Sequence, residues 1–110
     1  MNIIKKIEEE KCSIDELKSF LDDRNPIVLY HTMTYIGKKG YKTADIEEKL
    51  YKLSLKRESE DKLLGIYKIS DLAIATMIKL WEKEEDIEEY KHINEFEKGT
   101  VKRVFNEIEW

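Results

Sequence analysis

Residues 25–40, NPIVLYHTMTYIGKKG, encode a complete helix together with the signals for both of its ends. Asn25 is a good N-cap because its side-chain oxygen can accept a hydrogen bond from a free backbone N–H of the first turn. Pro26 suits the first helical position, and Gly40 can adopt the left-handed conformation that ends a helix. The side chains expected to face inward recur every three or four residues: Leu29, Thr32, Met33 and Ile36.

The rest of the 110-residue chain also predicts helices. Ser13 and Glu16 form a capping-box sequence at the start of a helix over residues 14–22, and Thr43 is expected to begin another. Residues 63–81, LLGIYKISDLAIATMIKLW, are the most apolar stretch, so we expect them to form the central and most buried helix. A short helix over residues 2–10 precedes these elements, and the wholly polar residues 56–62 predict a solvated turn.

Two more helices are predicted near the end of the chain. Gly99 is expected to end the first, because glycine is unfavourable inside a helix. Thr100 is expected to cap the last. The apolar sides of these two helices are drawn from Ile87, Tyr90, Ile93 and Phe96, and from Val101, Val104, Phe105 and Ile108.

The composition predicts one all-helical domain spanning residues 1–110. Hydrophobic residues make up 41% of the chain, enough for one core, and charged residues make up 40%, which indicates solvated helix faces. No apolar run approaches the roughly 20 residues that cross a bilayer. The N-terminus carries acids where an export signal needs apolar residues, and there is a single Cys. We therefore expect a cytoplasmic protein.

Successive helix pairs look related to each other. The side chains that follow Asn25-Pro26 have counterparts about 40 residues later, an offset typical of stacked helical hairpins: Val28, Thr32, Ile36 and Gly37 correspond to Ile69, Ala73, Met77 and Leu80. In these residues the chain resembles the HEAT-like (armadillo-type) helical repeat family. The resemblance implies an α-solenoid of two to three stacked antiparallel hairpins, whose second helices line a concave binding face. The alternative is an unrelated irregular helical bundle.

No group of residues predicts catalysis or metal binding. His31 and His92 have no second metal ligand one turn away, and Cys12 completes no metal pattern, so Cys12 is expected to be a small apolar contact. The GKKG sequence does not fit a phosphate-binding loop. The acids of residues 82–89, EKEEDIEE, are expected in water, where nothing separates the pKa values of a carboxylate pair. We therefore expect no enzyme, no metal and no cofactor.

What remains is an acidic surface. If the second helices line a concave face, the side chains opposite their apolar stripes point into it. We expect a partner-binding surface of Asp15, Glu47, Glu48, Tyr51, Glu85, Glu88 and Glu89, with Lys18 among them. Such a surface suits a basic protein, because complementary charge speeds encounter and disfavours wrong partners. The alternative is that these acids only keep the protein soluble.

The resulting hypothesis is a non-enzymatic protein-binding module with a net charge of −4. Its specific form is an immunity-type protein that neutralises a basic toxin, such as a nuclease. One alternative is a self-associating structural or regulatory subunit that pairs through Trp81 and Trp110. Another is a nucleic-acid-associated protein, against which the acidic balance argues, using Lys38, Lys39, Lys42, Lys102 and Arg103. Several aromatics exceed what the apolar stripes need, and each is either an interface anchor or part of the core or its rim: Tyr30, Tyr41, Tyr67, Trp81 and Trp110.

Overall fold

The computed structural model describes residues 3–9, 12–56, 67–81, 87–108 and 110. Within these ranges the chain forms helices and no β-strand, as predicted. The helices are α1 (Ile3–Glu8), α2 (Ile14–Phe20), α3 (Pro26–Lys39), α4 (Ala44–Ser54), α5 (Ile69–Trp81), α6 (Glu88–His92) and α7 (Glu95–Glu107). The predicted solvated turn over residues 56–62 lies outside the described residues, apart from Lys56.

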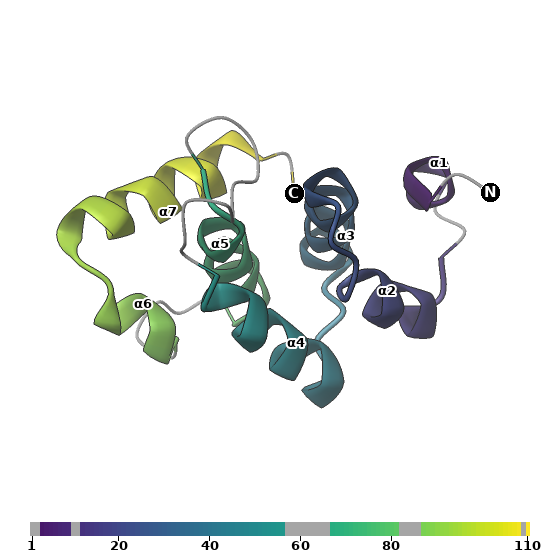
Figure 1. Ribbon diagram of the computed structural model, residues 1–110, viewed down its shortest axis with the longest axis horizontal. Coiled ribbons are helices and arrows are strands. Elements are labelled where there is room, and N and C mark those ends of the chain that lie inside the picture. The colour runs from purple at the N-terminus through teal and green to yellow at the C-terminus, as the bar shows by residue number, and fades with distance from the viewer. Residues whose placement is uncertain (1–2, 10–11, 57–66, 82–86, 109) are drawn as a thin grey trace.

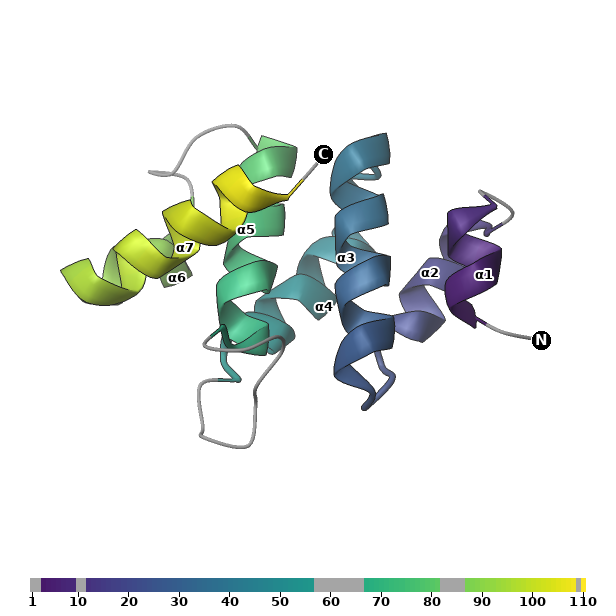
Figure 2. The same ribbon diagram turned by 90° about the horizontal axis from the view of Figure 1, so that it is seen from above.

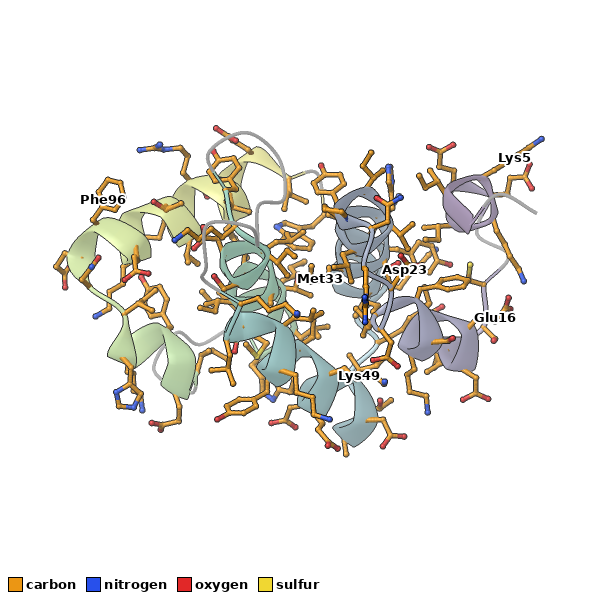
Figure 3. The ribbon with its side chains drawn as sticks, viewed as in Figure 1. Lys5, Glu16, Asp23, Met33, Lys49 and Phe96 are labelled. Carbon is orange, nitrogen blue, oxygen red and sulfur yellow. The ribbon has the colours of Figure 1, made fainter. Side chains whose placement is uncertain are left out.

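The helices lie in two layers. Helices α1, α3 and α5 stand side by side in one layer (Figure 2), while α2 and α4 lie along another side of the molecule (Figure 1). Helix α3 packs against α1, α2 and α5, and α2 also touches α4. Helix α5 is covered by α3, α4 and α7. The fold therefore has α3 and α5 at its centre, and the Met33 side chain lies between these two helices (Figure 3).

Both predicted ends of α3 are confirmed. The Asn25 side chain accepts a hydrogen bond from the Ile27 N–H at 2.9 Å, and Pro26 is the first helical residue. At the other end, Gly40 has φ 72° and ψ 32°, and its N–H donates to the Ile36 carbonyl at 2.9 Å. A residue with a Cβ would be strained in this left-handed conformation, which is why glycine stands here.

The starts of α2 and α4 also agree with the prediction. Ser13 and Glu16 form the reciprocal capping box of α2. Thr43 caps α4, its hydroxyl accepting from the Ile46 N–H at 3.2 Å.

Helix α5 is the most buried helix of the described chain, as predicted, but it has no exposed face over most of its length. Every residue from 69 to 78 is buried, Asp71 among them, whereas the pattern predicted one apolar stripe. Helices α3, α4 and α7 surround it, so its side chains need not alternate between polar and apolar positions. The helix begins at Ile69, and residues 63–66 lie outside the described part.

The predicted break at Gly99 is wrong. Helix α7 runs through Gly99, and Thr100 lies inside it and donates its hydroxyl to the Phe96 carbonyl at 3.2 Å. The cap is Asn94, whose side chain accepts from the Glu97 N–H at 2.8 Å. Glycine costs only about 1 kcal/mol inside a helix, so a good cap and buried valines further along outweigh it. Consequently Phe96 is not on the inward side; its side chain is 82% exposed.

Gly37 allows the C-terminal residue to lie directly on α3. An added Cβ at Gly37 would collide with the Trp110 ring. The Trp110 indole N–H donates to the Phe105 carbonyl at 3.0 Å. The centroids of the Phe105 and Trp110 rings are 5.7 Å apart. The absence of a side chain at Gly37 therefore lets the end of the chain pack across the central layer.

Alanine at the two helical glycines should have opposite effects. Gly99→Ala meets open space and should stabilise the protein by about 1 kcal/mol through helix propensity. Gly37→Ala should displace Trp110 and lower stability by about 1 kcal/mol, because the lost ring burial exceeds the propensity gain. Urea unfolding measures both effects, and faster exchange of the Trp110 indole proton identifies the displacement. Equal stabilisation by both substitutions would contradict the packing of Trp110 on Gly37.

Candidate functional site

Helix α4 divides its surface into three faces. Ile46, Leu50 and Leu53 are buried against the core. Asp45 and Lys49 point toward α2, because each forms an ion pair with a residue of α2 or of the turn that follows it. The remaining arc carries Glu47, Glu48, Tyr51 and Leu55, all exposed, and we call these four residues the outer face of α4.

The outer face has an apolar ridge with two carboxylates at its N-terminal end. Tyr51 is 48% exposed, and Leu55, at the end of the next turn, is 61% exposed. At helical spacing Glu47 lies one turn before Tyr51 in the same row as Tyr51 and Leu55, and Glu48 lies beside this row. An exposed aromatic and an exposed leucine one turn apart form the kind of patch that anchors a protein partner.

The charge of this ridge is partly neutralised. Glu48 lies 3.5 Å from Lys52 in an exposed pair, whose two side chains are 67% and 70% exposed. A pair in water is worth well under 1 kcal/mol, so Glu48 can exchange Lys52 for a basic group of a partner at little cost. Glu47 makes no ion pair with a described residue. The outer face therefore presents two carboxylates beside Tyr51.

A seam of ion pairs joins α2 to α4. Lys18 lies 3.0 Å from Asp45 and 3.3 Å from Asp15, and Lys49 lies 2.5 Å from Asp22. The hydrogen bond from Lys18 to Asp45, and then the one to Asp15, raise the pKa of the Lys18 ammonium. A polar hollow of about 420 Å³ follows this seam. Asp15 is exposed, but it belongs to this paired seam rather than to the outer face of α4.

The predicted residues of the third acidic helix are only partly described. Glu88 is exposed on α6 and lies 3.3 Å from Lys91 and 3.6 Å from the Nε2 atom of His92. Glu89 lies in α6, and nothing is described of its side chain; Glu85 lies outside the described residues. Helix α6 lies on the same side of the molecule as α4 (Figure 1). The structure thus brings Glu47, Glu48 and Tyr51 together and leaves Asp15 and Glu88 in local ion pairs.

The aromatics singled out in the sequence form a rim around the core. All five are partly buried and pack against the core. Lys42 lies over the Trp81 ring, with its Nζ 5.0 Å from the ring centroid, and Lys39 lies 5.8 Å from the ring of Tyr35. Lys38, Lys102 and Arg103 are exposed on α3 and α7.

Cys12 is buried, as predicted for a small apolar contact. Burial raises the pKa of its thiol, the charge of Glu16 adds to this effect, and Lys6 opposes it. His31 is half-buried, and its ring lies edge-on to the ring of Tyr30 with 5.4 Å between the two ring centroids. Among the described residues, no three His, Cys, Asp or Glu side chains are placed to hold a metal ion.

A further cavity, of about 550 Å³, was not predicted. It lies beside the turn between α2 and α3, and its lining comes from that turn, from α3, α4 and α5, and from Lys56 just beyond α4. The sequence signal was weak, because Arg24 lies 25 residues before the first of the three lysines of α4 and its C-terminal end, and the four cations share no motif: Arg24, Lys49, Lys52 and Lys56.

Neither a protein-family model, nor a curated protein, nor a solved structure matches this chain. Across the described ranges, every helix is too short or too polar to cross a bilayer. Function is therefore inferred from the surface of the molecule.

One carboxylate, Glu16, stabilises the fold in a way that can be tested by pH. Its pKa is lowered by a hydrogen bond from Lys6 and by the Ser13 N–H. A lowered folded-state pKa contributes stability above the unfolded value of about 4.3, and this contribution is lost as the pH falls through the folded value. Glu16→Gln should therefore lower stability at pH 7, and its difference from the wild type should shrink below about pH 4.

Urea unfolding at both pH values measures this difference. Glu8→Gln removes an exposed carboxylate of α1 and serves as the control. A Glu16→Gln difference that stays the same at neutral and acidic pH would contradict the assigned role of Glu16.

Proposed function

We propose that this chain is a non-enzymatic protein-binding module that binds a basic partner through the outer face of α4. The observation that carries this proposal is the exposed ridge of Tyr51 and Leu55, preceded by the carboxylates of Glu47 and Glu48 one turn earlier on the helix. A central aromatic supplies most of the binding energy in many interfaces, and surrounding charges set specificity and association rate.

The proposal includes a HEAT-like stack of helical hairpins. Its support is that α1 packs on α3, α3 packs on α5, and α2 touches α4, while α2 also packs on α3 and α4 on α5. In such a stack α4 is the middle second helix, with α2 and α6 on its two flanks. The outer face of α4 would then lie at the centre of the binding surface.

The ion-paired seam restricts where the partner gains energy. Asp15, Asp22 and Asp45 already have lysine partners, so a basic partner gains little by approaching them. Binding should depend mainly on burial of Tyr51 and Leu55. Glu47 and Glu48 should add steering that weakens as salt increases.

The specific role we propose is the neutralisation of a basic toxin, such as a nuclease, inside the cytoplasm. A nuclease binds a polyanion, so its active cleft is basic, and a protein that fills this cleft needs carboxylates around an apolar anchor. Glu47, Tyr51 and Glu48 have this composition.

Two other classes of function have weaker support. Self-association through Trp110 would compete with its contact with Gly37 in the same chain. Binding of nucleic acid would draw on Lys39 and Lys42, which already lie over aromatic rings.

Affinity capture with the purified protein and matched variants tests the proposal. Wild type and Phe96→Ala should recover the same basic protein, because Phe96 is an exposed aromatic on α7, away from α4. Tyr51→Ala should weaken binding by at least about thirtyfold, as expected when an interface anchor worth about 2 kcal/mol is lost. Glu47→Lys with Glu48→Lys should also weaken binding and reduce its dependence on salt.

Three results would count against the proposed role. Tyr51→Ala could behave like Phe96→Ala, the recovered partner could be acidic, or the basic partner could keep its full activity when it is saturated with this protein. A concentration-dependent dimer in sedimentation, abolished by Tyr51→Ala, would replace the proposal with self-association through the same ridge.

A further inference from the structure

The cavity beside the α2–α3 turn has an aliphatic floor. Its floor residues come from three helices, α3, α4 and α5, and from the turn before α3: Leu21, Pro26, Leu29, Leu53 and Ile69. Helices α3 and α5 both begin at this cavity, with Pro26 and Ile69 as their first residues. The volume of about 550 Å³ lies within the range of known ligand sites.

The rim of the cavity is basic, in contrast with the outer face of α4. Arg24, Lys49, Lys52 and Lys56 line it together with Asp22 and Asp23, so four cations face two carboxylates. Asp22 is paired with Lys49, and the Asp23 side chain accepts from the Asn25 N–H at 2.8 Å. Both carboxylates keep their charge, and four cations against two carboxylates leave the rim with an excess of two positive charges.

Three cations of the rim remain available for a ligand. Arg24 and Lys56 make no ion pair with a described residue, and Lys52 is held only by its exposed pair with Glu48. The positive ends of the α3 and α5 helix dipoles point in the same direction and add to this potential. The cavity thus combines an apolar floor with an excess of positive charge at its edge.

From this combination we propose that the cavity binds an acidic peptide segment of another protein, with an aliphatic side chain on the floor and carboxylates at the rim. The spacing of the cations favours a peptide over a simple fatty acid. Lys49 and Lys56 are seven residues apart on or just beyond α4, roughly 10 Å along the helix axis. One carboxylate cannot reach the whole row, whereas successive acidic side chains of one peptide can.

This inference does not depend on the outer face of α4. That face is acidic and takes a basic partner, whereas the cavity takes an acidic one, and the Glu48–Lys52 pair lies between them on the helix. Figure 3 shows Lys49 on α4 and Asp23 in the turn before α3. These are two of the segments that line the cavity. Loss of one binding activity therefore leaves the other in place.

Titration with defined peptides tests the cavity. The probe is a short capped peptide of glutamates with two leucines, and its two controls replace every Glu with Gln or every Leu with Ala. Methyl NMR should show shifts at Leu21, Leu29 and Leu53 with the probe, little shift with either control, and weaker binding at higher salt. Decanoate serves as the competing small acid.

Charge variants provide the second arm of the test. Arg24→Gln with Lys56→Gln should weaken the probe's affinity by about threefold or more, from loss of two charge contacts. Lys38→Gln with Lys102→Gln, which removes the same charge from exposed positions on α3 and α7, should leave the affinity unchanged. Circular dichroism confirms that both variants fold.

The proposal is overturned if the probe produces no shifts at the floor methyls. It is also overturned if the peptide without leucine binds equally well, if decanoate binds these methyls and the peptide does not, or if the two double variants weaken binding equally.

Discussion

Burial of α5 on all sides is the constraint on which the rest of the structure depends. Leu72, Ala73, Ile74 and Ala75 are fully buried, so no face of this helix is left for water. The alanines allow neighbouring helices to approach closely, and the large side chains fill the space between them. A helix this apolar is stable in water only when other helices cover its whole circumference. Helices α3, α4 and α7 provide that cover.

The two buried threonines of this layer form hydrogen bonds within their own helices, whereas the buried Ser70 hydroxyl of α5 has no hydrogen-bond partner among the described residues. The Thr76 hydroxyl donates to the Leu72 carbonyl at 2.8 Å, and the Thr32 hydroxyl donates to the Val28 carbonyl at 2.7 Å. Because neither hydroxyl needs a partner in the neighbouring helix, α3 and α5 can pack through apolar contacts alone. Uninterrupted apolar packing is what makes this layer the stable part of the fold.

The outer helices are held differently, and this difference leaves a surface for function. Helix α4 uses one face against α5, and ion pairs with α2 hold a second. Its third face is not needed for stability, so Tyr51 and Leu55 stay exposed there. Packing of the core therefore places no demand on these two side chains. The proposed binding role draws on their exposure.

The sequence predicts most helix ends, with Gly99 as the exception. It does not predict contacts between residues far apart in the chain. The caps at Ser13, Asn25 and Thr43 and the left-handed Gly40 act within one helical turn, so the residue pattern was sufficient. The helix end predicted at Gly99 is wrong because a single glycine only weakly destabilises a helix whose N-cap, Asn94, lies five residues earlier.

The two ion pairs of the seam that reach α4 join residues 27 positions apart: Lys18 with Asp45, and Asp22 with Lys49. The cavity needs four segments to meet: the turn before α3, α3 itself, α4 with its C-terminal end, and α5. Helix periodicity carries no information about either feature. Of the predicted partner-binding residues, Glu47, Glu48 and Tyr51 were placed together because a single helix carries all three.

Native-state amide hydrogen exchange tests most directly whether complete burial of α5 organises the fold. Amides of α5 between Leu72 and Met77, with those of α3 facing them, should exchange last and only through global unfolding. Amides of α1, which packs on the outer side of α3 and is joined to α2 by the Lys6–Glu16 pair, should exchange much earlier. If α5 exchanged as fast as α1, or if α1 and α2 were the last to exchange, α5 would not be the centre of this structure.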